Sequence, residues 1–250
     1  MSQAKSIVVI GGSRGIGLGL VKQALSDYPE ATVFATARTP EKATDLQALS
    51  DSNKGRLQIL ALDADDSNSI NQAATKIGQQ VESLDVVIYN SGVLNGFGNI
   101  LDVGAQSLID NMTTNVYGAY HTAIAFAPLL LKSKYERKSL VLLSSSFASM
   151  QLADEVAAAH EEGIAKGFDA TAMYNISKTA LNRLGKELDT VLARQGLPVL
   201  LLHPGLVKTD MNPFYDIEVP ESVAGMVKVI QTFTPGKKNF YSWNGDALPW

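Results

Sequence analysis

The chain has 250 residues, 46% of them hydrophobic, so it is long enough to bury the core of one α/β domain of ordinary size. Its net charge of −4 argues against nucleic acid or an anionic membrane as the main partner. The absence of cysteine excludes disulfides, thiolate catalysis and cysteine-ligated metals.

Short apolar runs alternate with longer segments of helical periodicity along the chain. The runs predict strands at residues 6–10, 32–36, 57–62, 85–89, 139–143 and 199–202, with a weaker one at 239–242. The periodic segments predict helices at residues 16–26, 40–49, 67–81, 106–131, 173–194 and 220–233. Apolar strands separated by helices are typical of a parallel sheet covered on both faces. We therefore predict the α/β class, with one doubly wound domain over residues 1–250 and a parallel seven-stranded sheet.

One segment departs from this alternation. Residues 149–171 connect a predicted strand to the next long helix and exceed the length of an ordinary strand-to-helix loop. Their middle, residues 154–166, is rich in Ala and Glu, which favours a helix of its own. The segment is either a substrate lid or a tolerated surface insertion.

The most informative motif is the glycine-rich turn at residues 11–17, between the first predicted strand and helix. Glycines let a backbone come close to a ligand, and the free N–H groups of the following helix favour an anion. The spacing Gly11-x-x-x-Gly15-x-Gly17 differs from the G-x-G-x-x-G fingerprint. The turn predicts a dinucleotide pyrophosphate site. The alternative is a helix-initiating turn that binds nothing.

Residues with acid–base chemistry lie farther along. Tyr174 and Lys178 are four residues apart in a predicted helix, so they share one face, and a nearby ammonium lowers the pKa of a tyrosine. A surface pair of this spacing is common by chance. The strand at 139–143 ends in three serines, at the sheet edge where ligands bind, and Asn115 lies inside a long helical pattern.

Together these residues resemble the short-chain dehydrogenase/reductase family, over essentially the whole chain. The segments 90–92 (Asn-Ser-Gly) and 203–211 add to the match. Residues 204–211 and 244–250 are similar to the sniffer, carbonyl-reductase and C-factor-like branch, with fungal polyketide ketoreductases as further relatives. The resemblance implies a Rossmann-type fold.

The resemblance also implies a role for each catalytic residue. Tyr174 would protonate the carbonyl oxygen as hydride arrives. Lys178 would bind the nicotinamide ribose and hold the pKa of Tyr174 down. Ser145 would position the carbonyl, and Asn115 would hold a water that links Lys178 to solvent.

Three positions leave details open. The family motif places the catalytic residue second in the strand-end serine pair, which favours Ser145, while Ser144 and Ser146 remain alternatives. Ile10 replaces the family's usual threonine, so a hydroxyl that commonly ties the glycine turn to the segment after the fourth strand is missing. Ser91 stands where the family has alanine.

The segment after the second strand predicts the cofactor. It holds no acidic residue for ribose hydroxyls, and Arg38 lies just beyond that position, with Arg14 in the glycine turn. Two guanidiniums can bind a 2′-phosphate, which favours NADP(H) over the alternative of two surface arginines. Asp63 would accept a hydrogen bond from the adenine, unless it only caps a helix. The resemblance implies a cofactor site of Gly11, Ser13, Arg14, Gly15, Ile16, Gly17, Arg38, Asp63, Asn90, Gly92, Lys178, Pro204, Gly205, Val207 and Thr209.

We therefore expect an NADPH-dependent reductase of a ketone or aldehyde on a fairly bulky, apolar or aromatic molecule. The alternatives are an NADP(H)-binding sensor or scaffold without turnover and an alcohol dehydrogenase that runs in the oxidising direction. We expect a cytoplasmic protein without a metal site, as a homodimer or homotetramer, with no nucleic-acid or membrane partner. Candidates for the substrate pocket are Phe97, Phe147, Met150, Phe214 and Tyr215.

Overall fold

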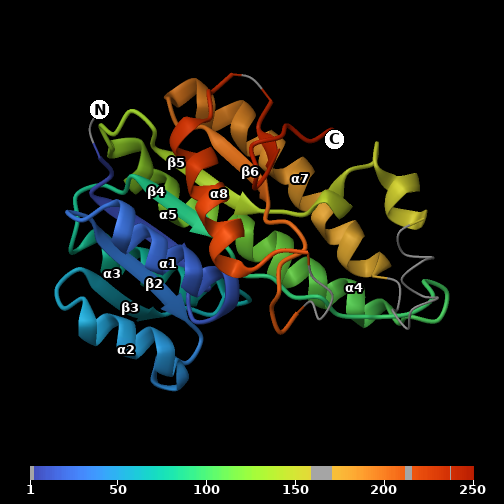
Figure 1. The fold of residues 1–250 in the computed structure, drawn as a ribbon, viewed down its shortest axis with the longest axis horizontal. Helices are drawn as coiled ribbons and strands as arrows, with labels where there is room; N and C mark the ends of the chain where they lie inside the picture. Colours follow the sequence, from blue (N-terminus) through green and yellow to red (C-terminus); the bar gives the residue numbers. More distant parts are fainter. Residues whose placement is uncertain (1–2, 159–170, 212–215, 237) are drawn as a thin grey trace.

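A computed structural model describes residues 3–158, 171–211, 216–236 and 238–250 (Figure 1). Its centre is one sheet of seven strands in the order β3-β2-β1-β4-β5-β6-β7, in which every neighbouring pair is parallel. The strands are β1 (Ser6–Ile10), β2 (Thr32–Ala37), β3 (Leu57–Ala61), β4 (Val86–Tyr89), β5 (Ser139–Leu143), β6 (Val199–His203) and β7 (Phe240–Ser242). The predicted seven-stranded parallel sheet is confirmed.

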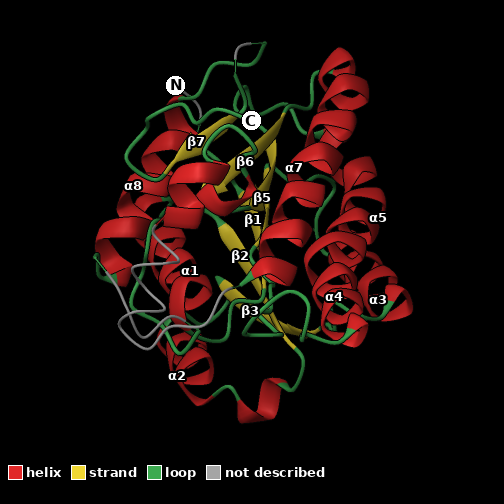
Figure 2. Ribbon diagram, turned by 90° about the vertical axis from the view of Figure 1, so that its right-hand side faces the viewer, coloured by secondary structure: helices red, strands yellow, loops and turns green. Residues whose placement is uncertain are grey.

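Helices cover both faces of the sheet, as predicted (Figure 2). Side chains of α1, α2 and α8 pack on one face, and side chains of α3, α5 and α7 pack on the other. The helices are α1 (Gly15–Asp27), α2 (Thr44–Ser52), α3 (Ser67–Gly78), α4 (Ala105–Met112), α5 (Ala119–Lys132), α7 (Ala172–Leu192) and α8 (Val219–Thr232). Short 3₁₀ turns lie at Pro40–Lys42, Ser146–Ala148 and Ala193–Gln195.

The sheet is apolar because both of its faces are covered. All five residues of β1 are buried, as are all five of β5. Successive side chains of a strand point to opposite faces, so Ile7 and Val9 join the core under α1 while Val8 and Ile10 join the core under α3 and α5. This explains why the strands read as continuous apolar runs rather than as alternating ones.

The helical pattern at residues 106–131 is not one regular helix. Between α4 and α5 the chain widens into a π-helical turn at Thr113–Gly118. The Tyr89 hydroxyl donates to the Thr114 carbonyl oxygen at 2.5 Å, and a Cβ at Gly118 would lie 2.3 Å from that hydroxyl. A buried tyrosine on β4 thus occupies the space beside the turn. The predicted helix at 40–49 likewise divides into a 3₁₀ turn and α2.

Only the ends of the 149–171 segment are described. Residues 153–158 are helical, and Thr171 precedes α7. The predicted helix at 154–166 therefore lies mostly outside the described residues. Among the helices that the structure describes, none has the length and apolar character needed to cross a bilayer.

Candidate active site

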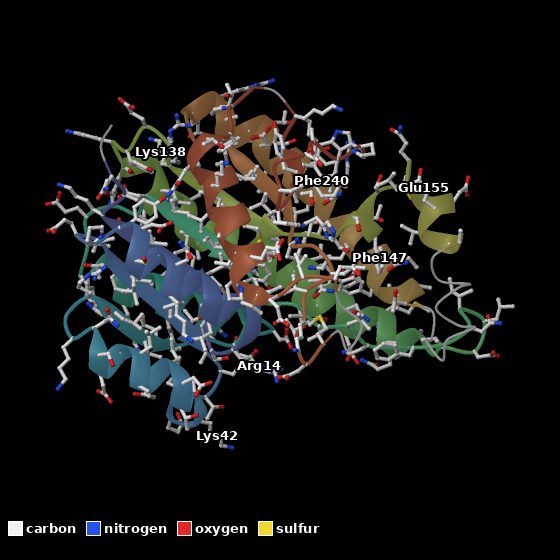
Figure 3. All side chains as sticks on the ribbon, viewed as in Figure 1. Arg14, Lys42, Lys138, Phe147, Glu155 and Phe240 are labelled. Carbon is white, nitrogen blue, oxygen red and sulfur yellow. The ribbon has the colours of Figure 1, made fainter. Side chains whose placement is uncertain are left out.

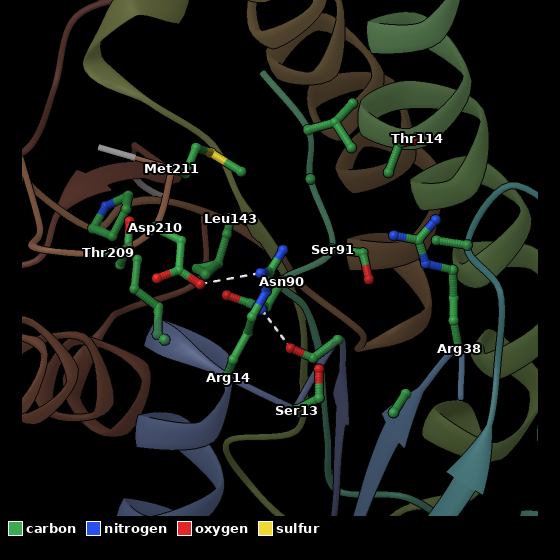
Figure 4. A pocket seen from close by; sticks show the side chains of 18 of the residues that line it. Ser13, Arg14, Arg38, Asn90, Ser91, Thr114, Leu143, Thr209, Asp210 and Met211 are labelled. Atoms are coloured by element: carbon green, nitrogen blue, oxygen red, sulfur yellow. Dashed lines mark hydrogen bonds and ion pairs between the residues drawn. The ribbon is translucent and has the colours of Figure 1, made fainter. Parts of the chain in front are cut away.

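The strand order reverses at β1, with β2 on one side and β4 on the other. At such a switch point the loops that follow the two strands diverge and leave a crevice at the carboxyl ends of the strands. A cleft of about 430 Å³ lies there. Its walls come from the segments that follow β1, β2, β3, β4 and β6, together with the end of β5 and the start of α7 (Figure 4).

The glycine-rich turn forms one wall of the cleft. Gly11 has a φ of +80° and Gly15 a φ of +51°, a region that residues with a Cβ rarely adopt. Helix α1 begins at Gly15 with no side-chain cap and no acidic residue in its first turn. Its first N–H groups are therefore available to an anion, which the positive end of the helix also attracts.

Two polar side chains fix this turn in place. The Gly11 N–H donates to Thr36 Oγ1 at 3.0 Å, and the Gly12 N–H donates to the Thr36 carbonyl at 2.8 Å. Asn90 Nδ2, after β4, donates to the Gly11 carbonyl at 2.7 Å. The turn is thus tied to the segment after β4 without the hydroxyl that Ile10 lacks. Thr36 is not among the predicted site residues, and its signal in the sequence is a hydroxyl among the apolar residues at the end of β2.

The two arginines lie apart from each other, Arg14 beside Asp210 and Arg38 away from both (Figure 4). Arg14 forms an ion pair with Asp210 at 3.1 Å, which connects the glycine turn to the segment after β6. Arg38 follows β2 and is exposed at the cleft wall. No acidic residue of β2 accompanies it. The Arg38 guanidinium is available to an anionic group at the edge of the cleft, whereas the Arg14 guanidinium is paired with Asp210, and both side chains are well exposed to solvent.

Most of the predicted cofactor residues line this cleft. They are Gly11, Ser13, Arg14, Gly15, Ile16, Arg38, Asp63, Asn90, Gly92, Lys178, Pro204 and Thr209. Gly17, Gly205 and Val207 lie behind the wall. A Cβ at Gly17 would meet the Gly11 carbonyl, and one at Gly205 would meet Ile217 and Trp243, so the structure gives these glycines packing roles.

Helix α7 brings Tyr174 and Lys178 to the opposite wall. Burial raises the pKa of Tyr174 to about 12, and a hydrogen bond with the Ser145 side chain offsets part of this rise. Burial lowers the pKa of Lys178 to about 8. Lys178 Nζ donates to the Leu143 carbonyl at 2.8 Å and lies 5.6 Å from the centre of the Tyr174 ring. The pKa of Tyr174 therefore moves up, opposite to the expected direction, because burial disfavours the charged phenolate.

The three serines after β5 differ in their contacts. The Ser145 side chain hydrogen-bonds to Tyr174 and accepts from the Phe147 N–H at 3.2 Å. The Ser144 hydroxyl donates to Asn182 Oδ1 at 2.6 Å. Ser146 begins the 3₁₀ turn. Ser144 lines the cleft. Between Ser144 and Ser145, however, it is the Ser145 side chain that contacts Tyr174.

Asn115 lies in the π-helical turn, fully buried. Its Oδ1 accepts from the Val93 N–H at 2.9 Å, and its Nδ2 donates to the Val93 carbonyl and to Ser177 Oγ. Ser177 in turn donates to the Tyr174 carbonyl at 2.7 Å. The side-chain amide thus holds the segment after β4 against α7. The expectation that Asn115 holds a water linking Lys178 to solvent stays a prediction.

The backbone at Gly92 passes close to both the Asn115 amide and the Lys178 ammonium. A Cβ there would lie 3.3 Å from Asn115 Oδ1 and 3.6 Å from Lys178 Nζ. The candidate pocket residues Phe97, Phe147 (labelled in Figure 3) and Met150 do not line the cleft, while Phe214 and Tyr215 lie outside the described residues. Within the described part of the chain, no group of three or more His, Asp or Glu side chains could hold a metal ion.

Comparison with known proteins agrees with this architecture. The sequence model of the short chain dehydrogenase family matches residues 5–159. The chain belongs to the short-chain dehydrogenase family. It is therefore an oxidoreductase of that type.

The individual relatives match over nearly the full length. An uncharacterised oxidoreductase of Schizosaccharomyces pombe is 34% identical over 98% of both chains. Among solved structures, the NADPH-bound carbonyl reductase from chicken fatty liver is 30% identical, with a TM-score of 0.88 over the whole of both chains. The carbonyl reductase Sniffer of D. melanogaster is 31% identical, with a TM-score of 0.86, and the match covers 99% of the present chain and all of the Drosophila chain.

Proposed function

We propose that this chain is an NADPH-dependent reductase of a ketone or aldehyde on a fairly bulky, apolar or aromatic molecule, with Tyr174 as the general acid. The observation that carries the proposal is that one cleft is lined both by the glycine-rich turn and by Tyr174 with the buried Lys178. The chicken and Drosophila relatives, both carbonyl reductases by name, support the same reaction class.

The residues present fit a phosphorylated dinucleotide. The uncapped start of α1 suits a pyrophosphate, and the absence of a side chain at Gly92 leaves space beside Lys178. Arg38 suits a 2′-phosphate, since β2 has no carboxylate to bind the ribose hydroxyls, and Arg14 would join it on leaving Asp210. Bound in this cleft, the reduced cofactor would supply the hydride.

The chain's own residues would supply the proton. The Tyr174 hydroxyl stays protonated at neutral pH because burial keeps its pKa high, so it can donate to the carbonyl oxygen. The Lys178 ammonium, next to the ring, would stabilise the phenolate that remains. The Ser145 side chain would hold the carbonyl oxygen near Tyr174. Val93 and Met211 give the cleft apolar surface for the substrate.

A carbonyl panel tests the function directly. Diketones, quinones, aromatic aldehydes and polyketide-like ketones are each mixed with the protein and NADPH, and NADPH oxidation is followed. We expect turnover with at least one bulky apolar class. Tight NADPH binding with no turnover would contradict the proposal and favour the sensor. Turnover only with alcohols and NADP⁺ would favour the oxidising enzyme.

The cofactor preference should depend on Arg38. Arg38→Asp places a carboxylate where a 2′-phosphate would lie, so we expect the ratio of kcat/KM for NADPH to kcat/KM for NADH to fall by about 100-fold. Arg194→Asp, with the same charge change on the exposed turn before β6, is the control and should leave the ratio unchanged. An equal loss with both cofactors would contradict the assignment.

The pH dependence should follow Lys178. Its pKa of about 8 means that the ammonium loses its proton as the pH rises through that value, while Tyr174 stays protonated. We therefore expect kcat/KM for NADPH in carbonyl reduction to be level below about pH 7 and to fall above about pH 8. Steady-state rates across this range test it. A level profile up to about pH 10 would contradict the role of the ammonium.

A further inference from the structure

Three consecutive residues at the end of β5 contact three residues of α7. The Leu143 carbonyl accepts from Lys178, the Ser144 hydroxyl donates to Asn182, and the Ser145 side chain hydrogen-bonds to Tyr174. The α7 partners are spaced four residues apart, so they lie on one face of the helix in successive turns. Two of these contacts involve the proposed proton-transfer pair. The middle contact, between Ser144 and Asn182, has no part in the chemistry described above.

The Ser144 contact lies where the sheet ends. The Ser144 N–H donates to the Leu202 carbonyl at 2.7 Å, which continues the pairing of β5 with β6. The chain then leaves the sheet, since Ser145 is the N-cap of the 3₁₀ turn. Beyond Ser144, side chains of α7 take over the positioning of the strand end. Both Ser144 and Asn182 are buried, at 2% and 3% exposure.

The Asn182 amide is not favourable for packing alone. Its Nδ2 is buried and has no hydrogen-bond partner among the described residues. A buried donor without a partner destabilises the folded chain, a cost that a leucine of similar size would avoid. The benefit of an asparagine at this position is therefore its bond to Ser144, through which it can act on both neighbours of that serine.

We propose that Asn182 is a positioning residue for proton transfer, which holds the end of β5 against α7 through Ser144. This inference rests on the proposed function. The bond fixes the two neighbouring contacts, of the Leu143 carbonyl with Lys178 and of Ser145 with Tyr174. Asn182 reaches the reacting atoms only through these groups. The glycine-rich turn lies on the other wall of the cleft, so binding of the cofactor phosphates does not depend on this bond.

Asn182→Leu should therefore separate catalysis from binding. We expect kcat for carbonyl reduction to fall about tenfold, the scale of one buried hydrogen bond, while the dissociation constant of NADPH changes less than about twofold. Stopped-flow reduction and fluorescence titration measure the two quantities. In a Ser144→Ala background the same substitution should have no further effect, because the residue acts through that serine.

A second readout needs neither cofactor nor substrate. Trace acetylation of Lys178 in the cofactor-free chain, followed against pH by peptide mass spectrometry, reports the pKa of that amine. In the unaltered chain the midpoint should be about 8. Asn182→Leu should loosen the strand end and admit water, which moves the midpoint toward the ordinary value of 10.5.

Asn239→Leu is the matched control. Asn239 is also buried, donates once, to the Val199 carbonyl, and also has one amide atom without a partner among the described residues. It precedes β7, away from the cleft lining. Asn239→Leu should leave both kcat and the acetylation midpoint of Lys178 unchanged. A change equal to that caused by Asn182→Leu would overturn the inference.

The remaining outcomes are also decisive. Unchanged kcat and midpoint in Asn182→Leu would overturn the inference while the proposed function stands. If that variant fails to fold, Ser144→Ala removes the same bond from the other side and should give the same two changes; their absence overturns the inference. If the unaltered chain reduces no carbonyl, the proposed function fails, and an unmoved acetylation midpoint then overturns the positioning role separately.

Discussion

Replacing Tyr174 with phenylalanine should lower kcat for carbonyl reduction by about 10²–10⁴-fold, the usual contribution of a general acid. The substitution removes only the hydroxyl. The ring remains to pack at the start of α7, and Lys178 keeps its bond to the Leu143 carbonyl. The glycine-rich turn is untouched, so the dissociation constant of NADPH should change less than about threefold. Single-turnover NADPH oxidation and fluorescence titration measure the two quantities.

The control is the same substitution at a tyrosine that does not line the cleft. Tyr120→Phe, at an exposed position of α5, makes the same chemical change and should leave kcat unaltered. Near-normal turnover by Tyr174→Phe on the same carbonyl would contradict the acid role. A parallel loss of NADPH binding would instead show that the hydroxyl holds the cofactor rather than the substrate.

The sheet and the cleft could be predicted because they follow from local patterns. Buried parallel strands must be apolar on both faces, which makes runs such as β1 and β5 visible in the sequence. Parallel strands also bring their carboxyl ends to one edge. The glycine turn, Arg38 and Asn90 could therefore be assigned to one cleft although they are far apart in the chain.

Other features depend on contacts between distant segments, which periodicity does not encode. The π-helical turn at Thr113–Gly118 is contacted by a residue of β4, since the Tyr89 hydroxyl donates a hydrogen bond to its Thr114 carbonyl. The pKa of Tyr174 rises because the fold buries the side chain, whereas the spacing of four residues indicated only that an ammonium is near. The choice between Ser144 and Ser145 likewise required Asn182, one helical turn beyond Lys178.

Gly17→Ala should be the most damaging small substitution in the glycine-rich turn. Helix propensity alone predicts that alanine is better by about 1 kcal/mol inside α1. A Cβ at Gly17, however, would lie 2.0 Å from the Gly11 carbonyl oxygen and 2.6 Å from Asn90 Nδ2, so the tie between the turn and the segment after β4 must break. We expect NADPH binding to weaken by about 100-fold and the free energy of unfolding to fall by about 1–3 kcal/mol.

A helical glycine with room around it provides the comparison. A Cβ at Gly78, at the end of α3, would lie 3.5 Å from Leu129, an ordinary contact, so Gly78→Ala should keep or slightly raise the stability. Denaturant unfolding and NADPH titration of both variants separate helix propensity from the contact. If Gly17→Ala bound NADPH as tightly as the unaltered chain, the close approach of Gly17 to the Gly11 carbonyl would not be what shapes the glycine-rich wall for NADPH.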